Sequence, residues 1–385
     1  MKEASVFRES LDLYNNFLDS VRKVKYDEIT NCLVDFLEDN ENKKPKIISL
    51  GRGRTGLSGI SGLQELYNHL EETPYEFVPY SMEKDPINRH IRRDDLVLVE
   101  SGSGNTKETI DDFKKALEVE ANCIAIVGKE NSTIYECAEE HRIPILLLKS
   151  ERKKENDISS PMGSEFEFKY WMFHRCSTPE ILNKLGLSSD SYEKRFDIYR
   201  RNAECLHEIK DENISEWIDR LTNRYGIFVF DGVDQSGHVA EQFEMRFRHL
   251  GYEPFMYKDS NRKVFKKGCC YIPITGSGNT EDVVKRARDD AIKKGADVMP
   301  ITANLDSEIA KIVRDEKDLL YIPILSEFQE SLKNYSSDDR ISPPNGYKPR
   351  IPFFETNAYI VTNCIVAQIA HNDGKLTKFM EHMHV

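Results

Sequence analysis

Short apolar runs alternate with longer amphipathic segments along most of the chain. In the first half the apolar runs are residues 47–50, 96–99, 123–127 and 143–148. Their length and mostly apolar composition are typical of strands that are buried on both faces. Between them, hydrophobic residues recur at helical spacing, as at 109–120. This alternation predicts right-handed crossovers and a parallel sheet with helices on both faces.

The second half of the chain repeats this order of elements. Its apolar runs are 227–230, 270–274, 298–302 and 319–324, with a helical pattern at 283–294. Amphipathic segments open both halves, at 7–18 and 29–37 and again at 192–209 and 214–221. We therefore predict an α/β fold of two doubly wound, three-layer (αβα) domains with parallel sheets, related by internal duplication. The predicted domains are residues 1–188 and 189–385, because a helix end is followed by a new cap near 186–190.

The composition of the chain agrees with two globular domains. The 385 residues, 39% hydrophobic and 31% charged, suffice for two sizeable cores. No apolar run approaches the roughly 20 residues of a membrane-spanning helix, and the first ten residues lack an apolar leader. The eight cysteines form no CxxC pair, which indicates reduced thiols. We expect a cytoplasmic protein without a membrane partner.

Residues 326–352, rich in Ser, Asp, Pro and Asn, predict an irregular loop before the last helix.

Charge narrows the possible ligands. The formal net charge of −12 argues against general nucleic-acid binding, which needs a basic face. An anionic substrate must therefore be attracted by a local arrangement of donors rather than by the overall field.

A repeated hydroxyl-rich motif has the chemistry of such a site. Residues 101–106 read Ser-Gly-Ser-Gly-Asn-Thr, and residues 275–280 read Thr-Gly-Ser-Gly-Asn-Thr, each between a predicted strand and a predicted helix. Hydroxyls and free N–H groups at a helix N-terminus can converge on a phosphate, and glycines let the backbone approach it. The candidate phosphate-binding residues are Ser101, Ser103, Thr106, Thr275, Ser277 and Thr280. The alternative is an ordinary loop that caps a helix. The lysine of a nucleotide-binding P-loop is missing, since Lys107 follows the threonine.

The two halves resemble SIS (sugar isomerase) domains and are most similar to the 6-phospho-3-hexuloisomerase family. In the first half the matching residues are 51–56 (Gly-Arg-Gly-Arg-Thr-Gly), 101–106 and 161–167 (Pro-Met-Gly-Ser-Glu-Phe-Glu). In the second half they are 236–237, 244–251, 275–280 and 354–355. The resemblance implies a phosphosugar isomerase that moves a proton between adjacent carbons through a cis-enediol. Its implied substrate is a phosphorylated ketose or aldose, such as 3-hexulose 6-phosphate or fructose 6-phosphate, and neither a cofactor nor a metal is implied.

The resemblance also assigns roles to individual residues. Glu167 falls on the position of the catalytic base, Glu355 is its partner in the second copy, and His382 matches a histidine of the C-terminal tail. For the two glutamates, the alternative is a carboxylate that complements a helix N-terminus. For His382, the alternatives are a solvated tail or an HxH metal site formed with His384. Further substrate contacts are expected from Gly53, Arg54, Thr55, Asn105, Ser236 and Asn279.

Pairing of the two halves, as in related dimers, would let one half donate His382 to the cleft of the other. We then expect a homo-oligomer, a dimer of such pseudo-dimers. The first turn contains Arg52 and Arg54, whereas the equivalent second turn contains Asp234 and Gln235, a difference that would weaken the second cleft or make it regulatory. Two other functions stay open at this point: a non-catalytic sugar-phosphate-binding regulatory protein, and an amino-sugar phosphate isomerase or deaminase.

Overall fold

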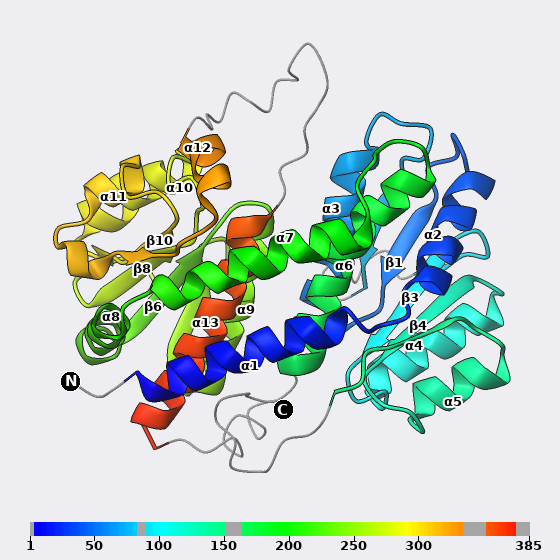
Figure 1. Ribbon diagram of the computed structural model, residues 1–385. Helices are drawn as coiled ribbons and strands as arrows, with labels where there is room; N and C mark the ends of the chain where they lie inside the picture. The colour runs from blue at the N-terminus through cyan, green and yellow to red at the C-terminus, as the bar shows by residue number, and fades with distance from the viewer. Residues whose placement is uncertain (1–3, 83–89, 151–163, 334–351, 375–385) are drawn as a thin grey trace. The chain divides into compact units, whose positions relative to one another are not determined.

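The computed structural model describes residues 4–82, 90–150, 164–333 and 352–374. The chain divides into two compact units (Figure 1). Of the described residues, those from 16 to 150 and from 164 to 198 form the N-terminal unit, and residues 4–15 and those from 199 to 374 form the C-terminal unit. The first helix, α1 (Ser5–Val21), therefore contributes residues to both units.

The N-terminal unit is built on one parallel sheet of five strands. The strand order is β2-β1-β3-β4-β5. The strands are β1 (Lys46–Ser49), β2 (Val78–Ser81), β3 (Leu96–Ser101), β4 (Asn122–Val127) and β5 (Ile145–Leu147). The helices are α2 (Asp27–Asp39), α3 (Gly53–Leu70), α4 (Lys107–Glu118), α5 (Thr133–Glu140) and α6 (Ser164–Lys184).

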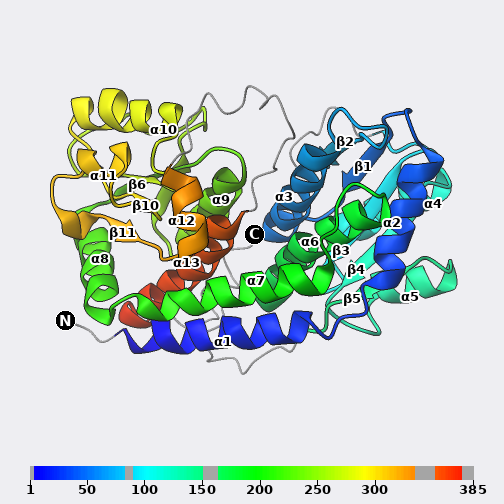
Figure 2. The ribbon, with the colours of Figure 1, turned by 45° about the horizontal axis from the view of Figure 1, so that its top comes forward.

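Helices cover both faces of this sheet. The helix α6 packs against α2 and α3, and Figure 2 shows α3 and α6 side by side. On the other face, Phe113 of α4 and Ile134 of α5 pack on Val97, Val99 and other strand residues in one apolar cluster. The sheet is therefore the middle of three layers, as predicted for a doubly wound domain.

The C-terminal unit repeats this topology. Its strands are β6 (Ile227–Asp231), β7 (Glu253–Met256), β8 (Cys269–Pro273), β9 (Asp297–Val298), β10 (Ile301–Thr302) and β11 (Leu320–Tyr321). They pair in parallel in the orders β7-β6-β8-β9 and β10-β11, and a bridge between Ile274 and Ile301 joins the two sets. The order is thus equivalent to that of the N-terminal unit.

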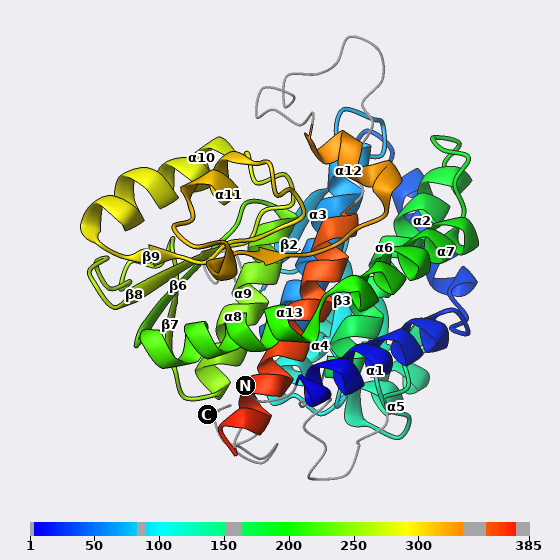
Figure 3. The ribbon, with the colours of Figure 1, turned by 60° about the vertical axis from the view of Figure 1, so that its left-hand side comes forward.

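The helical segments of this unit follow the same plan. They are the end of α7 (Tyr192–Glu204) from residue 199 on, η2 (Cys205–Glu208), α8 (Asp211–Arg224), α9 (Gln235–His249), α10 (Glu281–Lys285), η3 (Arg286–Ala291), η4 (Ile292–Lys294), α11 (Glu308–Ile312), η5 (Glu316–Asp318), α12 (Ser326–Lys333) and α13 (Phe353–Asn372). Helices α9 and α13 pack together, as α3 and α6 do in the other unit (Figure 3). In the part of the chain that is described, no helix combines the length and apolar character that crossing a membrane requires.

The predicted α/β class with parallel sheets is confirmed, but two strands and one helix depart from the sequence analysis. The edge strands β2 and β7 were not predicted, because each contains a proline, Pro79 and Pro254. These prolines pair with equivalent positions, Ile47 and Phe228, and a sheet edge tolerates the missing N–H. The prediction of an irregular loop was wrong for residues 326–333, which form α12. Its Phe328 stacks on Phe353 with ring centroids 3.9 Å apart, a long-range contact that composition does not indicate.

Candidate functional site

The strand order of the N-terminal unit places two loops next to each other. Strands β1 and β3 are neighbours, and the chain leaves them towards opposite edges of the sheet, to β2 and to β4. In open α/β sheets, the crevice at the carboxyl ends of two such strands is where ligands bind. Here that position is formed by the turn at 51–53, before α3, and by the hydroxyl-rich loop at 101–106, before α4.

The loop at 101–106 brings the three predicted phosphate-binding hydroxyls together. The Ser101 Oγ lies 3.0 Å from the Thr106 Oγ1 and 3.4 Å from the Ser103 Oγ. The backbone N–H of Gly104 donates to Ser101 Oγ (3.0 Å). Thr106 occupies the N-cap position of α4 without a side-chain cap hydrogen bond, and Ser103 is exposed. The hydroxyls therefore converge at the N-terminus of a helix, where an anion is favoured.

Two contacts hold the shape of this loop. Gly104 has a φ of +66°, and a β-carbon there would lie 2.0 Å from the Ser132 Oγ, so only glycine fits without displacing neighbours. The Asn105 Oδ1 accepts hydrogen bonds from the N–H (3.0 Å) and the hydroxyl (2.8 Å) of Thr133. The side-chain carbonyl of Asn105, predicted as a substrate contact, thus ties the loop to the start of α5.

The predicted base is buried in an ion pair. Glu167 lies in the first turn of α6, and its Oε2 is 2.9 Å from the Nη1 of Arg54. The side chains are 12% and 4% exposed, respectively. Burial raises the pKa of Glu167 and the Arg54 guanidinium opposes this shift. Gly53 begins α3 with a φ of +54°, and Thr55 is partly exposed in its first turn. The structure thus joins Arg54 and Glu167, which the sequence analysis named separately.

A second buried carboxyl, Glu100, was missed by the sequence analysis. It is 1% exposed and directly precedes Ser101. The hydroxyls of Ser49 and Tyr170 donate to it at 2.5 Å each, and the N–H of Gly51 donates at 2.8 Å. Burial raises its pKa to about 7, and these three hydrogen bonds oppose the shift. A glutamate at the end of an otherwise apolar strand was the signal that could have revealed it.

The loop at 275–280 has nearly the same hydrogen bonds as its counterpart. The Thr275 Oγ1 lies 3.2 Å from the Thr280 Oγ1 and accepts from the Gly278 N–H at 3.2 Å. The Asn279 Oδ1 accepts from the Glu308 N–H at 2.9 Å, as Asn105 does from Thr133. The difference is burial, since Ser277 is 0% exposed whereas Ser103 is exposed.

The second copy also surrounds its carboxyl differently. The Ser236 hydroxyl donates to the Oε1 of Glu355 at 2.8 Å, and both residues are buried. Asp234 stands at the position of Gly53 and has a φ of +52°, a backbone strain that glycine avoids. The second turn therefore keeps the positive φ of the first, and a serine hydroxyl donates to its carboxyl.

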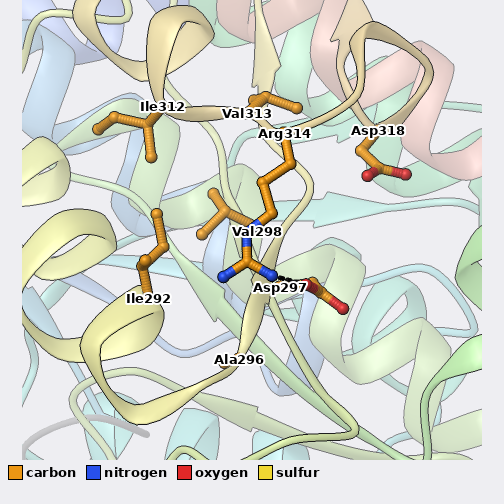
Figure 4. A pocket seen from close by; sticks show the side chains of 8 residues that line it. All are labelled: Ile292, Ala296, Asp297, Val298, Ile312, Val313, Arg314 and Asp318. Carbon is orange, nitrogen blue, oxygen red and sulfur yellow. Dashed lines mark hydrogen bonds and ion pairs between the residues drawn. The ribbon is translucent and has the colours of Figure 1, made fainter.

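The remaining features are the predicted C-terminal histidine, the possible metal site and a hollow in the C-terminal unit. His382 and residues 161–163 lie outside the described residues. Among the described residues, no group of three His, Cys, Asp or Glu side chains could hold a metal ion. A small hollow in the C-terminal unit contains none of the predicted site residues (Figure 4). It is lined by Ile292, Ala296, Asp297, Val298, Ile312, Val313, Arg314 and Asp318.

Comparisons with known proteins give this geometry a context. Residues 41–147 match the model of the SIS domain. The 3-hexulose-6-phosphate isomerase of Methanocaldococcus jannaschii is 30% identical over 187 residues, which cover 49% of this chain and 95% of that protein.

Two solved structures share the fold over nearly the whole chain. The tagatose-6-phosphate ketose/aldose isomerase of Escherichia coli has a TM-score of 0.62 at 14% identity, covering 96% of this chain and 95% of that one. The C-terminal domain of the glucosamine-fructose-6-phosphate aminotransferase of Francisella tularensis has a TM-score of 0.64 at 11% identity, covering 97% of both chains. This coverage agrees with the duplicated architecture.

Proposed function

This chain belongs to the SIS (sugar isomerase) domain family, and from that premise we propose that it is a phosphosugar isomerase. The proposed reaction moves a proton between adjacent carbons of a phosphorylated ketose or aldose through a cis-enediol. The observation that carries the proposal is the convergence of the Ser101, Ser103 and Thr106 hydroxyls at the N-terminus of α4. A helix N-terminus with several nearby donors is suited to a phosphate group.

Glu167 is the proposed base. It lies in the first turn of α6, and α6 packs on α3, the helix that carries Arg54. A carboxyl whose pKa is raised by burial is closer to the operating pH of a general base than an ordinary glutamate. Arg54 keeps its carboxylate form accessible by offsetting part of that shift. The proposed role of His382 is to move the proton between the oxygens of the enediol.

The proposed substrate pair is 3-hexulose 6-phosphate and fructose 6-phosphate. The support is the relative in Methanocaldococcus jannaschii, which is named for that substrate. An amino-sugar phosphate remains the second substrate class, because one solved structure of the same fold is a domain of a glucosamine-fructose-6-phosphate aminotransferase. A cytoplasmic homo-oligomer, a dimer of pseudo-dimers, is the proposed assembly.

A non-catalytic sugar-phosphate-binding regulatory protein is the alternative function. Two observations favour a regulatory function for the second copy. Ser277 is fully buried, and Glu355 accepts a hydrogen bond from a serine hydroxyl, whereas Glu167 pairs with a guanidinium. The second copy would then regulate, while the first copy carries the reaction.

Turnover of the candidate sugars, followed by NMR, separates these functions. Glu167→Gln keeps the size of the side chain but removes the base, so we expect turnover to fall by about 10²–10⁴-fold. Glu355→Gln serves as the matched control in the second copy, and we expect a much smaller loss. Full activity of Glu167→Gln would contradict the assignment of the base, whereas binding by the native protein without any turnover would favour the regulatory function.

A further inference from the structure

The carboxyl of Glu100 joins three separate elements of the N-terminal unit. It accepts the hydroxyl of Ser49 at the end of β1, the N–H of Gly51 in the following turn, and the hydroxyl of Tyr170 on α6. Glu100 itself belongs to β3 and directly precedes Ser101, the first residue of the hydroxyl-rich loop at 101–106, which is called the phosphate loop below. One side chain thus connects the turn before α3 to the loop before α4.

Two glycines lie closely against the Glu100 carboxyl. A β-carbon on Gly51 would lie 2.5 Å from its Oε2, and a β-carbon on Gly59 would lie 2.5 Å from its Oε1. Real β-carbons essentially never come so close to an oxygen, so the carboxyl in this position requires glycine, or a shift of its own oxygens, at both residues. The backbone of Gly56 and the Ser49 hydroxyl restrict the same two positions.

The second copy is built differently at the position of Glu100. Ile274 occupies the position of Glu100, one residue before Thr275. The buried acid nearest the second turn is Asp231 at the end of β6, which accepts from Tyr271 (2.5 Å) and from the N–H of Gly232 (2.9 Å) and pairs with Arg286 of η3 (3.0 Å). A carboxyl on the residue directly before the hydroxyl-rich loop is thus a feature of the first copy, whose Ser103 is the exposed one.

We propose that Glu100 is a positioning residue, which holds the turn at 51–53 against the phosphate loop and makes phosphate binding by the first copy depend on its protonation. This inference rests on the proposed function. The turn leads directly into α3, whose second residue is Arg54, the partner of Glu167. Glu100 therefore sets the distance between the phosphate-binding hydroxyls and the predicted base without touching the substrate itself.

Protonation matters because the two forms of Glu100 make different hydrogen bonds. As a carboxylate it accepts all three donors, and as an acid it must donate to one of the two hydroxyls. Its pKa of about 7 places this change near neutral pH. Tyr170 is the titratable group that faces it from α6; β1 offers a serine, the turn a backbone amide and α3 a glycine. A phosphate dianion on the adjacent loop disfavours a second negative charge, so binding should be accompanied by proton uptake.

The test measures the dissociation constant of fructose 6-phosphate for the full chain by calorimetry at pH 6, 7 and 8. We compare the native protein with Glu100→Gln, Glu100→Ile and Tyr170→Phe, and use Glu108→Gln as a control that removes an exposed charge from the first turn of α4. Glu100→Gln mimics the protonated acid, so the ratio of native to variant dissociation constants should rise about tenfold from pH 6 to pH 8. Glu108→Gln should leave the pH dependence of the native protein unchanged.

Glu100→Ile copies the second half, and we expect it to weaken binding about tenfold at every pH. In the absence of ligand it should also speed backbone hydrogen exchange at 50–56 and 101–106, and Tyr170→Phe should do so to a smaller extent. Superimposable pH profiles for the native protein and Glu100→Gln would overturn the proton linkage, and unchanged exchange in Glu100→Ile would overturn the positioning role. If the native protein binds no sugar phosphate, the proposed function and the proton linkage both fail, and hydrogen exchange still decides the positioning role.

Discussion

The Arg54–Glu167 pair makes a quantitative prediction about stability. Arg54→Met keeps much of the buried volume at this position but removes the guanidinium that lies 2.9 Å from the Glu167 carboxylate. The side chains are 4% and 12% exposed, so water replaces little of the lost interaction. Removing one partner of a buried pair costs about 3–5 kcal/mol of the free energy of unfolding. We expect a loss of about 3 kcal/mol at pH 8.

The same substitution should cost less at acidic pH. Burial already raises the pKa of Glu167, and the loss of Arg54 removes the cause that lowers it. The folded state of Arg54→Met then keeps a proton on Glu167 at pH values where its unfolded chain has released that proton. The free energy of unfolding therefore falls as pH rises above the ordinary glutamate pKa, so the cost of Arg54→Met should be smaller at pH 5 than at pH 8.

The assay is urea unfolding followed by tryptophan fluorescence. The chain has two tryptophans, Trp171 in the N-terminal unit and Trp217 in the C-terminal unit, so Trp217→Phe leaves one reporter in the unit that contains the pair. A double-mutant cycle with Arg54→Met and Glu167→Gln isolates the coupling between the two side chains.

A matched exposed pair provides the control. Arg93 and Glu120 lie 3.1 Å apart with side chains 76% and 70% exposed, and the same cycle there should give less than about 1 kcal/mol. Additivity of the Arg54 and Glu167 substitutions within about 0.5 kcal/mol would refute the argument, because it would mean that burial does not strengthen this pair.

Two further predictions concern the phosphate loop and a buried histidine. Gly104→Ala should weaken binding of fructose 6-phosphate at least tenfold, because its β-carbon meets the Ser132 Oγ at 2.0 Å; Gly186→Ala, with a φ of +72° and open space around it, should leave the dissociation constant unchanged. Equal affinities of the two variants would be evidence against a tightly fitted loop. Burial lowers the pKa of His174 to about 3, so the native ring stays neutral while the unfolded chain takes up a proton below the ordinary pKa of 6.5. The free energy of unfolding should therefore fall as pH drops from about 6.5 towards 3, and this fall should shrink in His174→Asn; an identical pH dependence in both proteins would contradict the assignment.

Much of the candidate site could be predicted from local patterns in the amino-acid sequence. The two hydroxyl-rich loops were predicted because a strand, a Gly-Ser-Gly run and a helix follow one another directly in the chain, and the structure brings their hydroxyls together as expected. Glu167 was named only through a family resemblance, since a single glutamate in a helical segment has no distinctive pattern. Glu100 was overlooked because its hydrogen-bond partners Ser49 and Tyr170 are 51 and 70 residues away.

The class of fold, the duplication and the place of the hydroxyl-rich loops could be predicted from the amino-acid sequence alone. These features depend on hydrophobic period, on glycines and on the order of neighbouring segments, all of which are local. The tertiary structure alone decided that Arg54 lies beside Glu167, that Glu100 is buried between two glycines, and that Ser277 is buried while Ser103 is exposed. Burial and pairing depend on which distant segments pack together, and so do the raised pKa values of Glu100 and Glu167, because desolvation is their largest cause.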